Sequence, residues 1–449
     1  MNAGTGNRLG HETSTYLRGA AHQPVDWLPW GGEAFRRAKA LDRPILLDVG
    51  ATWCHWCHVI DRESYEDPDL AKVINEHFVA VKVDRDERPD IDARYQQAVG
   101  SLTGQGGWPL TAFLTPEGKV FYGGTYFPPK DSYNRPSFRK VLLAASKHYR
   151  ESKEEVLRDA ESLHRGLVER PRSQFSDAIV DEQTLKEGLE SLRNQSDPVN
   201  GGFGSAPKFP HTGAVEWLMA DAHRTGREGS LKIVTRTLLG MARGGVYDQI
   251  GGGFHRYSTD GQWIVPHFEK MLYDNAGLLA NYVHAWQLTG VPLFRETAEG
   301  ILSWTAEVLS DREAGGYYAS QDADVGMDDD GDYFTWTTAE LRAALPAEDA
   351  TVVAAYYDIA DRGEMHHNPA KNVLYVDREP DLIAKETGIP AERVRDILTR
   401  ARVRLKAIRD TRPRPAVDRT IFANWNGMMI SVSLEAAVAS VDPTWARSP

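Results

Sequence analysis

The sequence contains few cysteines. Only two occur among 449 residues, Cys54 and Cys57, and both stand in one four-residue window. A secreted scaffold that is held together by disulfides needs many more cysteines than this. The two residues therefore offer one reactive pair and exclude a covalent framework.

Long hydrophobic runs and an excess of basic residues are also missing. No window approaches the run of about eighteen apolar residues that is typical of a membrane helix, and Met1 to Ala20 hold no apolar signal core. Lysine and arginine number 52 against 64 aspartates and glutamates, a formal net charge of -12. This acidic balance argues against nucleic acid and anionic membranes as partners. We expect a cytoplasmic protein with neither partner.

The first part of the chain, 1–170, has an α/β pattern. Pro44–Val49 is a short apolar run typical of a buried parallel strand, and Phe78–Val83 alternates like a second strand. Two further strands flank Pro116-Glu117-Gly118, the pattern of a hairpin. A helix is expected to begin at the cysteines.

The second part, 175–449, is predicted to be all-α. A helix-favouring stretch at Phe138–Leu167 and a linker at Arg170–Ser173 lead into it. Helical patterns then occur at Asp181–Asn194, Thr212–Arg224, Glu228–Arg243, His267–Leu288, Leu293–Ser310, Thr338–Ala344, Asp381–Glu386 and Glu392–Asp410. Loops rich in glycine and aromatic residues separate these patterns, which favours helical hairpins with a site at one end.

The order strand, C-x-x-C, helix suits a thiol–disulfide site. Cys54 would stand where the helix dipole and unsatisfied N–H groups lower the pKa of a thiol, and the thiolate is the nucleophile. Cys57, one turn later, could attack the mixed disulfide and release the product. His55 and His58 could add positive charge or shuttle protons.

The two cysteines allow three other interpretations: haem attachment, zinc binding and inert thiols. Cys54-His55-Trp56-Cys57-His58 matches the haem-attachment pattern, but that chemistry normally accompanies export. Zinc would need ligands around a tetrahedron, which neighbours on one turn cannot easily supply, and no second Cys or His pair has matching spacing. We therefore expect no metal and no cofactor. Two inert buried thiols remain the third alternative.

Trp108-Pro109 precedes the predicted hairpin. A cis peptide bond at Pro109 would place backbone beside the disulfide, where an extended substrate could pair with it. Trp108 and Pro109 therefore join the cysteines and the two histidines as candidate catalytic-site residues.

The first part resembles the thioredoxin-like domain of the spermatogenesis-associated protein 20 family. The resemblance is carried by Pro24-Val25-Asp26-Trp27, Cys54-His55-Trp56-Cys57-His58-Val59, Val81-Lys82-Val83-Asp84-Arg85-Asp86-Glu87-Arg88-Pro89-Asp90, Thr103-Gly104-Gln105-Gly106-Gly107-Trp108-Pro109-Leu110 and Gly124-Thr125-Tyr126-Phe127-Pro128. It implies a thioredoxin fold, with Cys54 and Cys57 as redox pair and Pro109 as cis-proline. Trp53 departs from the small polar residue usual in the family, which affects access to Cys54.

The helical part carries polar residues beside aromatic ones, as a sugar site requires. Aromatic rings stack on pyranose faces, carboxylates and amides bond hydroxyls, and a base with a partner acid supports epimerisation. The candidate substrate-binding residues are Asp248, His255, His267, Glu269, Tyr273, Asp274, Asp322, Asp324, Asp418, Asn424 and Trp425. The alternative is that these side chains only cap helices and form turns.

The helical part is similar to the C-terminal half of the same family. The matching segments are His267-Phe268-Glu269-Lys270-Met271-Leu272-Tyr273-Asp274-Asn275-Ala276 and Asp418 with Asn424-Trp425-Asn426-Gly427-Met428. The resemblance implies a six-hairpin (α/α)6 toroid like that of N-acylglucosamine 2-epimerases and six-hairpin glycosidases. Because such a ring needs more helices than the patterns supply, we expect a toroid that is open, truncated or completed by another chain.

Three functions follow as hypotheses. The first is thiol–disulfide exchange through the C-x-x-C pair, with protein thiols, protein disulfides or a reductase as partner. The second is a sugar epimerase, isomerase or glycosidase in the helical domain, with a carbohydrate ligand and a regulatory thioredoxin-like domain. The third is a non-catalytic protein-interaction module.

Overall fold

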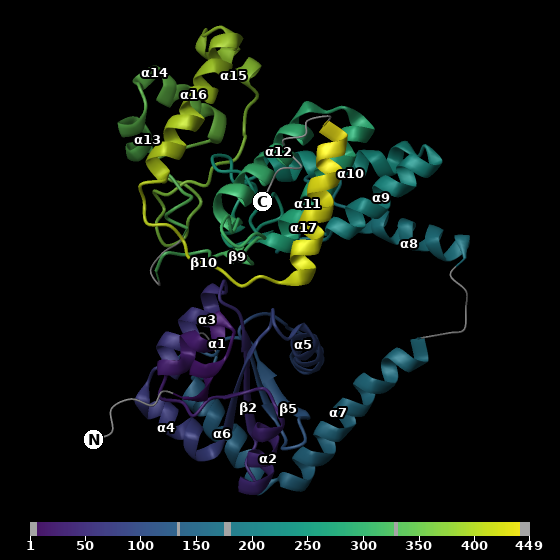
Figure 1. The fold of residues 1–449 in the computed structure, drawn as a ribbon, viewed down its shortest axis with the longest axis vertical. Coiled ribbons are helices and arrows are strands. Elements are labelled where there is room, and N and C mark those ends of the chain that lie inside the picture. The colour runs from purple at the N-terminus through teal and green to yellow at the C-terminus, as the bar shows by residue number, and fades with distance from the viewer. Residues whose placement is uncertain (1–6, 133–134, 175–180, 327–330, 441–449) are drawn as a thin grey trace. The chain divides into compact units, whose positions relative to one another are not determined.

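The computed structural model describes residues 7–132, 135–174, 181–326 and 331–440. The chain forms two compact units, Met1–Ile179 and Val180–Pro449 (Figure 1). The first unit is α/β and the second is helical, so the two predicted fold classes are confirmed. None of the described helices is both long and apolar enough to cross a bilayer.

The first unit is built on a five-stranded sheet in the order β1-β3-β2-β4-β5. Its strands are β1 (Leu28–Pro29), β2 (Ile45–Gly50), β3 (Val79–Asp84), β4 (Leu110–Leu114) and β5 (Val120–Gly124). Its helices are η1 (Arg8–His11), α1 (Thr15–Gly19), η2 (Ala20–His22), α2 (Gly32–Leu41), α3 (His55–Ile60), η3 (Asp61–Tyr65), α4 (Pro68–His77), α5 (Pro89–Thr103), α6 (Phe138–Glu151) and α7 (Lys153–Gln174). Strands β1, β3 and β2 run parallel to one another, whereas β4 runs antiparallel to both of its neighbours, β2 and β5.

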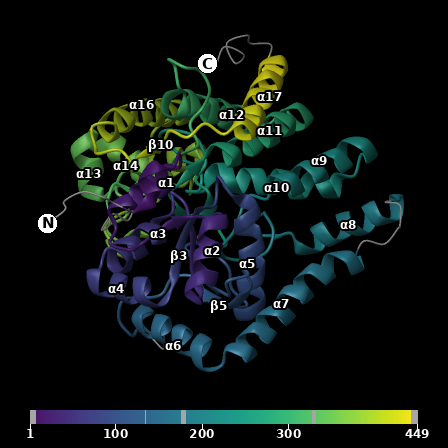
Figure 2. The same cartoon turned by 60° about the horizontal axis from the view of Figure 1, so that its bottom comes forward.

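The two faces of this sheet are covered differently. Side chains alternate along each strand, so Leu47, Val81 and Ala112 point to one face and pack with residues of α2 and α5. Figure 2 shows α2 and α5 beside the strands of this sheet. Asp48 lies opposite Lys82 on the other face, and both side chains are fully buried. The sheet therefore contains a buried charged pair on this face.

Several boundaries differ from the predicted ones. The stretch Phe138–Leu167 forms two helices, because α6 ends at Glu151 and α7 begins at Lys153. The expected linker Arg170–Ser173 lies within α7, and the two units divide at Ile179. The domain limits 1–170 and 175–449 stay predictions.

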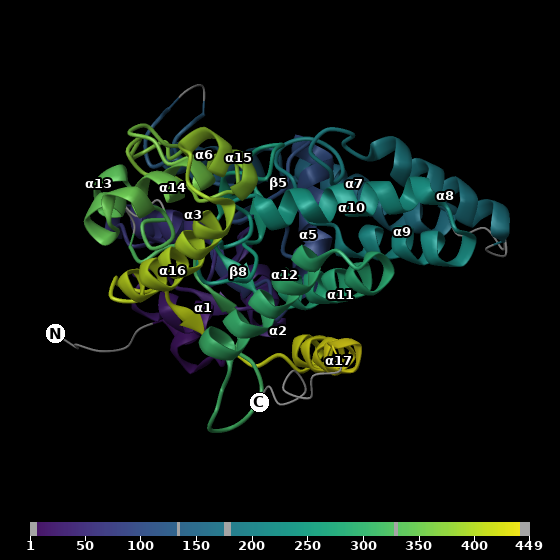
Figure 3. The same cartoon turned by 90° about the horizontal axis from the view of Figure 1, so that it is seen from above.

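The second unit consists mainly of helices (Figure 3). These are α8 (Glu182–Gln195), α9 (Thr212–Thr225), α10 (Glu228–Arg243), α11 (Leu272–Thr289), α12 (Pro292–Trp304), η4 (Thr305–Leu309), α13 (Thr338–Ala344), α14 (Ala347–Tyr357), α15 (Pro380–Thr387), α16 (Ala391–Arg409) and α17 (Ala423–Ser440). Short strands β6 (Tyr257–Ser258) and β7 (Pro266–His267) pair with each other, and β8 (Lys270–Met271), β9 (Ser320–Gln321) and β10 (Val417–Asp418) form a second sheet in the order β10-β9-β8.

The predicted helix His267–Leu288 begins too early. His267 belongs to β7, and Lys270 and Met271 form β8, so α11 begins only at Leu272. The backbone of these residues pairs with β6 and β9 instead of forming helical hydrogen bonds. This correction places His267 and Glu269 on extended backbone, where their side chains are neighbours.

Candidate active site

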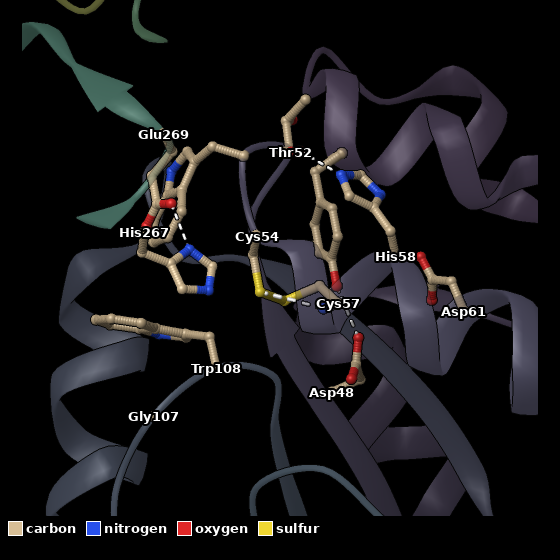
Figure 4. Close-up of a disulfide and its surroundings, with 12 residues drawn as sticks. Asp48, Thr52, Cys54, Cys57, His58, Asp61, Gly107, Trp108, His267 and Glu269 are labelled. Atoms are coloured by element: carbon tan, nitrogen blue, oxygen red, sulfur yellow. Dashed lines mark hydrogen bonds and ion pairs between the residues drawn. A yellow bond between two sulfur atoms is a disulfide. The ribbon is translucent and has the colours of Figure 1, made fainter. Parts of the chain in front are cut away.

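Cys54 and Cys57 form a disulfide at the start of α3 (Figure 4). Cys54 is the N-cap residue, and its Sγ accepts a hydrogen bond from the backbone N–H of Cys57 at 3.2 Å. Cys54 exposes 5% of its surface, whereas Cys57 exposes none. Amide groups at a helix start favour negative charge on the capping atom. The geometry therefore distinguishes an outer, amide-bonded sulfur from an inner one.

The peptide bond between Trp108 and Pro109 is cis, as the sequence hypothesis requires. Val49 in β2 pairs with Leu110 in β4. The loop that leaves β2 toward Cys54 and the segment that enters β4 through Pro109 therefore meet at the same end of the sheet. Figure 4 shows Trp108 beside the disulfide.

Arg85, just beyond β3, connects the residues that precede Cys54 and Pro109. Its guanidinium carbon lies 5.7 Å from the ring centre of Trp53 and 4.6 Å from that of Trp108. It donates to Asp86 at 2.9 Å and to Asp92 at 3.3 Å. The same two carboxylates accept the indole N–H groups, Asp86 from Trp53 and Asp92 from Trp108. Five side chains thus form one closed network.

A buried polar cluster lies beneath the cysteines. Asp48 accepts hydrogen bonds from Lys82 at 2.7 Å, Tyr16 at 3.0 Å and Tyr65 at 3.2 Å. Lys82 also donates to Asp61 at 2.8 Å. Two carboxylates therefore face one ammonium group inside the protein, a combination that favours retention of an extra proton.

The pKa values of this cluster are shifted accordingly. Burial and the charge of Asp61 raise the pKa of Asp48, although Lys82 opposes the change. Burial disfavours the charge on Lys82, but Asp48 and Asp61 outweigh it and raise the pKa of the ammonium. Burial also raises the pKa of the Tyr16 hydroxyl well above its usual value. Asp48 is thus a carboxyl group that binds a proton more readily than an exposed one.

This cluster reaches Cys57 through Gly50. A Cβ on Gly50 would overlap the Tyr16 hydroxyl and lie 2.8 Å from Cys57 Sγ. The hydroxyl and the inner sulfur are therefore near neighbours, and only glycine leaves room for both. A chain of polar atoms leads from Asp48 through Tyr16 toward the disulfide.

The two predicted histidines have different settings. His58 donates from Nε2 to the Thr52 carbonyl at 2.6 Å, which anchors the turn before Cys54 (Figure 4). The ring of His55 packs edge to face on Trp56, with centroids 5.6 Å apart. Trp56 is 46% exposed and lies 5.0 Å from the ring of Tyr126. Aromatic side chains thus adjoin the cysteine pair.

Sequence reasoning missed the buried cluster and the arginine network. A signal for the first was available, because Asp48 interrupts the apolar run Pro44–Val49 and Lys82 interrupts Phe78–Val83. Charges at the centre of buried strands need partners. The contact of Arg85 with two tryptophans has no such signal, because it depends on loops that are distant in sequence.

In the helical unit, part of the predicted sugar site forms an outer group. His267 Nδ1 lies 2.5 Å from Glu269 Oε2, and Tyr257 stacks on His267 with centroids 5.2 Å apart. Burial disfavours the charged form of each partner, but their mutual attraction raises the pKa of His267 and lowers that of Glu269. Asp324 also raises the pKa of His267. The pair thus joins a buried Glu269 to a partly exposed His267 and has an aromatic neighbour.

Arg256 extends the outer group toward α11 and α17. It pairs with Asp274 at 3.1 Å and donates to the hydroxyl of Tyr273. The ring of Tyr273 meets that of Trp425 with centroids 4.7 Å apart. Five predicted residues, His267, Glu269, Tyr273, Asp274 and Trp425, are thus drawn together.

Two predicted residues lie in a separate inner group. Asp248 accepts from Lys270 at 2.7 Å and pairs with Arg409, which lowers its pKa well below the usual range despite burial. His255 donates from Nδ1 to the Phe268 carbonyl at 2.7 Å. Burial and the charge of Lys270 lower the pKa of His255 to about 3, so it is neutral at physiological pH.

Asp322 and Asp418 accept hydrogen bonds from residues near them in the chain. Asp322 accepts from the N–H of Ala323, and Asp418 accepts from Thr420. Asn424 is exposed in the first turn of α17. Among the described residues, no three His, Cys, Asp or Glu side chains are arranged to hold a metal ion.

Comparisons with known proteins agree with the two-unit architecture. Residues 6–168 match the family Thioredox_DsbH, described as a protein of unknown function, DUF255. Human spermatogenesis-associated protein 20 is 38% identical over 458 residues, which cover 95% of this chain and 58% of the human protein. An uncharacterized protein of Caenorhabditis elegans is 34% identical, covering 97% of this chain and 62% of that protein.

One solved structure, a sugar epimerase from a ruminal bacterium, is 13% identical and covers 59% of this chain and 84% of its own, with a TM-score of 0.28. We draw nothing about activity from this slight likeness. The chain spans little more than half the length of the human relative. The expectation of a toroid that is open, truncated or completed by another chain stays a prediction. The sequence similarity to the spermatogenesis-associated protein 20 relatives runs along almost the whole of this chain.

Proposed function

We propose that the first unit carries out thiol–disulfide exchange. The observation that carries the proposal is the Cys54–Cys57 disulfide at the start of α3, with the inner sulfur beside the Tyr16–Asp48 chain. Cys54 is the attacking residue, because it accepts an amide hydrogen bond and is the more exposed of the two.

The reaction proceeds by two exchanges. In the reduced protein, the Cys54 thiolate attacks a substrate disulfide, forms a mixed disulfide and releases one substrate thiolate. The Cys57 thiolate then attacks Cys54 Sγ, which breaks the mixed disulfide and releases the second substrate thiol. Two electrons pass to the substrate, and the Cys54–Cys57 disulfide remains. Oxidation of a dithiol substrate is the same sequence in reverse.

The second step needs a proton acceptor, because Cys57 is fully buried. Burial disfavours a thiolate, so Cys57 must lose its proton at the moment of attack. Asp48 accepts this proton through the Tyr16 hydroxyl, 3.0 Å away. Burial and the charge of Asp61 raise the pKa of Asp48, so its carboxylate is a stronger base than an exposed one.

The substrates are protein thiols or disulfides, or a reductase that regenerates the pair. The segment at Trp108 and Pro109 contains the cis peptide bond and lies next to the disulfide, where its backbone could pair with a polypeptide.

The test is capture of the mixed disulfide. Cys57→Ser lacks the resolving thiol, so a peptide disulfide should remain attached to Cys54 and be visible by mass spectrometry until dithiothreitol releases it. Cys54→Ser is the matched control and should capture little. An inert pair predicts equal, slow labelling of both variants, and that result would reject the proposal. If the protein is a non-catalytic interaction module, the variant that carries both Cys54→Ser and Cys57→Ser should keep all partner binding.

A carbohydrate site in the helical unit is a second candidate, favoured by the His267–Glu269 pair beside Tyr257. His267 would transfer a proton at a sugar carbon, and Glu269 would hold its charge. A screen of N-acyl sugars and oligosaccharides should show turnover that Glu269→Gln and His267→Ala abolish. His223→Ala, at an exposed position on α9, should preserve it. Failure of every sugar to bind or react would reject this candidate.

A further inference from the structure

The helical unit contains a cavity of about 110 Å³ with an unusual charge distribution. Its charged lining residues are Asp248, Lys270, Glu307, Lys406, Arg409, Asp410 and Arg414. Aromatic side chains of Trp304, Tyr333 and Phe334 complete much of the wall. All of these residues belong to the second unit, from β8, α12, η4, α16 and the neighbouring loops.

The innermost charges do not balance. Lys270 is fully buried and Arg409 is 4% exposed, and both bind Asp248. Arg409 Nη1 donates to the two carboxylate oxygens of Asp248 at 2.7 and 2.9 Å, and Lys270 Nζ donates to one of them at 2.7 Å. His255 is neutral here. One buried carboxylate therefore faces two buried cations, and an unneutralised buried charge is costly.

The outer charges compensate one another and do not supply the missing anion. Lys406 donates to Glu307 at 2.7 Å and to Asp410 at 2.9 Å. Arg414 pairs with Asp410 at 3.6 Å. Two carboxylates and two cations thus cancel at the partly exposed rim, so the inner surplus of one positive charge persists.

A second observation comes from the guanidinium itself. Arg409 Nε is buried and meets no hydrogen-bond acceptor among the residues that the structure describes. A buried donor without an acceptor loses its hydrogen bonds to water and forms none within the protein. Lys270 and Arg409 both border the cavity. An anionic hydrogen-bond acceptor placed there would compensate both the surplus positive charge and the unpaired donor.

We propose that this cavity binds a small oxyanion, a phosphate or carboxylate group, between Lys270 and Arg409. Guanidinium and ammonium groups are the side chains that bind such anions most strongly. The volume corresponds to roughly three or four water molecules, so it admits one such group and not a whole sugar. This site is independent of the redox proposal.

Protonation of Lys270 gives the site a pH signature. Burial and the charge of Arg409 lower the pKa of Lys270 to about 8, although Asp248 and Glu307 oppose the shift. A bound anion stabilises the ammonium form and raises this pKa. Binding should therefore take up protons at and above pH 8 and none well below it, where Lys270 is already charged.

The test uses the full chain and titrates sulfate, phosphate and acetate by calorimetry at constant ionic strength. Sulfate keeps its charge over the relevant pH range, so proton uptake on its binding reports on the protein. Preference for the tetrahedral anions would identify a phosphate site, and preference for acetate a carboxylate site. Arg409→Lys keeps the charge but loses the paired N–H donors of the guanidinium group and its Nε, and should weaken binding roughly tenfold.

Arg400→Lys is the matched control on the same helix, because Arg400 is 66% exposed and absent from the cavity wall. It should bind like the natural protein. Absence of saturable binding, or equal affinity in the Arg409→Lys variant, would overturn the proposal. If that variant does not fold, proton uptake by the natural protein decides: binding without uptake above pH 8 would also overturn it.

Discussion

The rings of Trp53 and Trp108 meet edge to face with their centroids 5.7 Å apart, and the guanidinium of Arg85 lies over both. Trp53 immediately precedes Cys54, and Trp108 immediately precedes Pro109. The spacing between the outer sulfur and the backbone at the cis-proline therefore depends on one arginine. Asp86 and Asp92 hold that arginine and both indole N–H groups.

Arg85→Lys should selectively slow exchange with polypeptides. Lysine keeps the charge but cannot stack on two rings and bind two carboxylates at once. We expect kcat/KM for a peptide disulfide to fall roughly tenfold, since misplacement of binding backbone costs rate. A small disulfide that contacts only sulfur should react within about twofold of the natural rate. Equal losses for both substrates would show that Arg85 does not position the substrate.

The same variant has a spectroscopic signature. The coupled indoles should give a near-ultraviolet circular dichroism band that Arg85→Lys reduces. Arg88→Lys, a nearby exposed arginine paired with Asp90, is the matched control and should leave the band unchanged.

Asp48→Asn should slow release of the captured substrate. Asparagine cannot accept the proton of Cys57, so decay of the mixed disulfide at neutral pH should slow about 10- to 100-fold. Raising the pH should recover much of the rate, because Cys57 then ionises without help. Stopped-flow measurement of the two steps checks this, and the initial attack by Cys54 should be nearly unchanged. Equal release rates at neutral pH would exclude Asp48 as the base.

Asp84 should make stability depend on pH. Burial and the charge of Asp86 raise the pKa of Asp84 from 3.8 to about 7. Between these values the unfolded chain loses this proton while the folded protein keeps it. The free energy of unfolding should therefore fall as pH rises, by up to about 1.4 kcal/mol per pH unit, and level off above pH 7.

Urea unfolding from pH 4 to pH 8 measures this dependence. Asp84→Asn should flatten the slope in that window, whereas Asp26→Asn, at a side chain 63% exposed, should not. An unchanged slope in Asp84→Asn would assign the pH dependence to other groups.

Gly50→Ala should strain the floor of the site. The added Cβ would overlap the Tyr16 hydroxyl and press on Cys57 Sγ. Overpacking of this kind costs about 1 to 3 kcal/mol in unfolding free energy. Gly19→Ala is the matched control because no atom lies within 4 Å of its added Cβ. Thermal unfolding checks both, and an unchanged transition in Gly50→Ala would show that Tyr16 is free to move aside.

The sequence by itself determined the strands that carry the cysteine site. The apolar runs predicted at Pro44–Val49 and Phe78–Val83 correspond to β2 and β3, and the Pro116-Glu117-Gly118 turn joins β4 to β5. Such strands are visible in sequence because burial on both faces requires consecutive apolar residues. The C-x-x-C pair at a helix start is equally local, since it depends on residues within one turn.

Only the tertiary structure decided which distant groups meet. Asp48 and Lys82 face each other because two strands pair in one register, and Arg85 reaches two tryptophans because two loops leave the same end of the sheet. His267 lies on a strand instead of a helix because it pairs with Tyr257 of β6, which stands outside the predicted helix His267–Leu288. Hydrogen bonds and ion pairs between remote segments leave no periodicity in the chain, and they become apparent only once the backbone has folded.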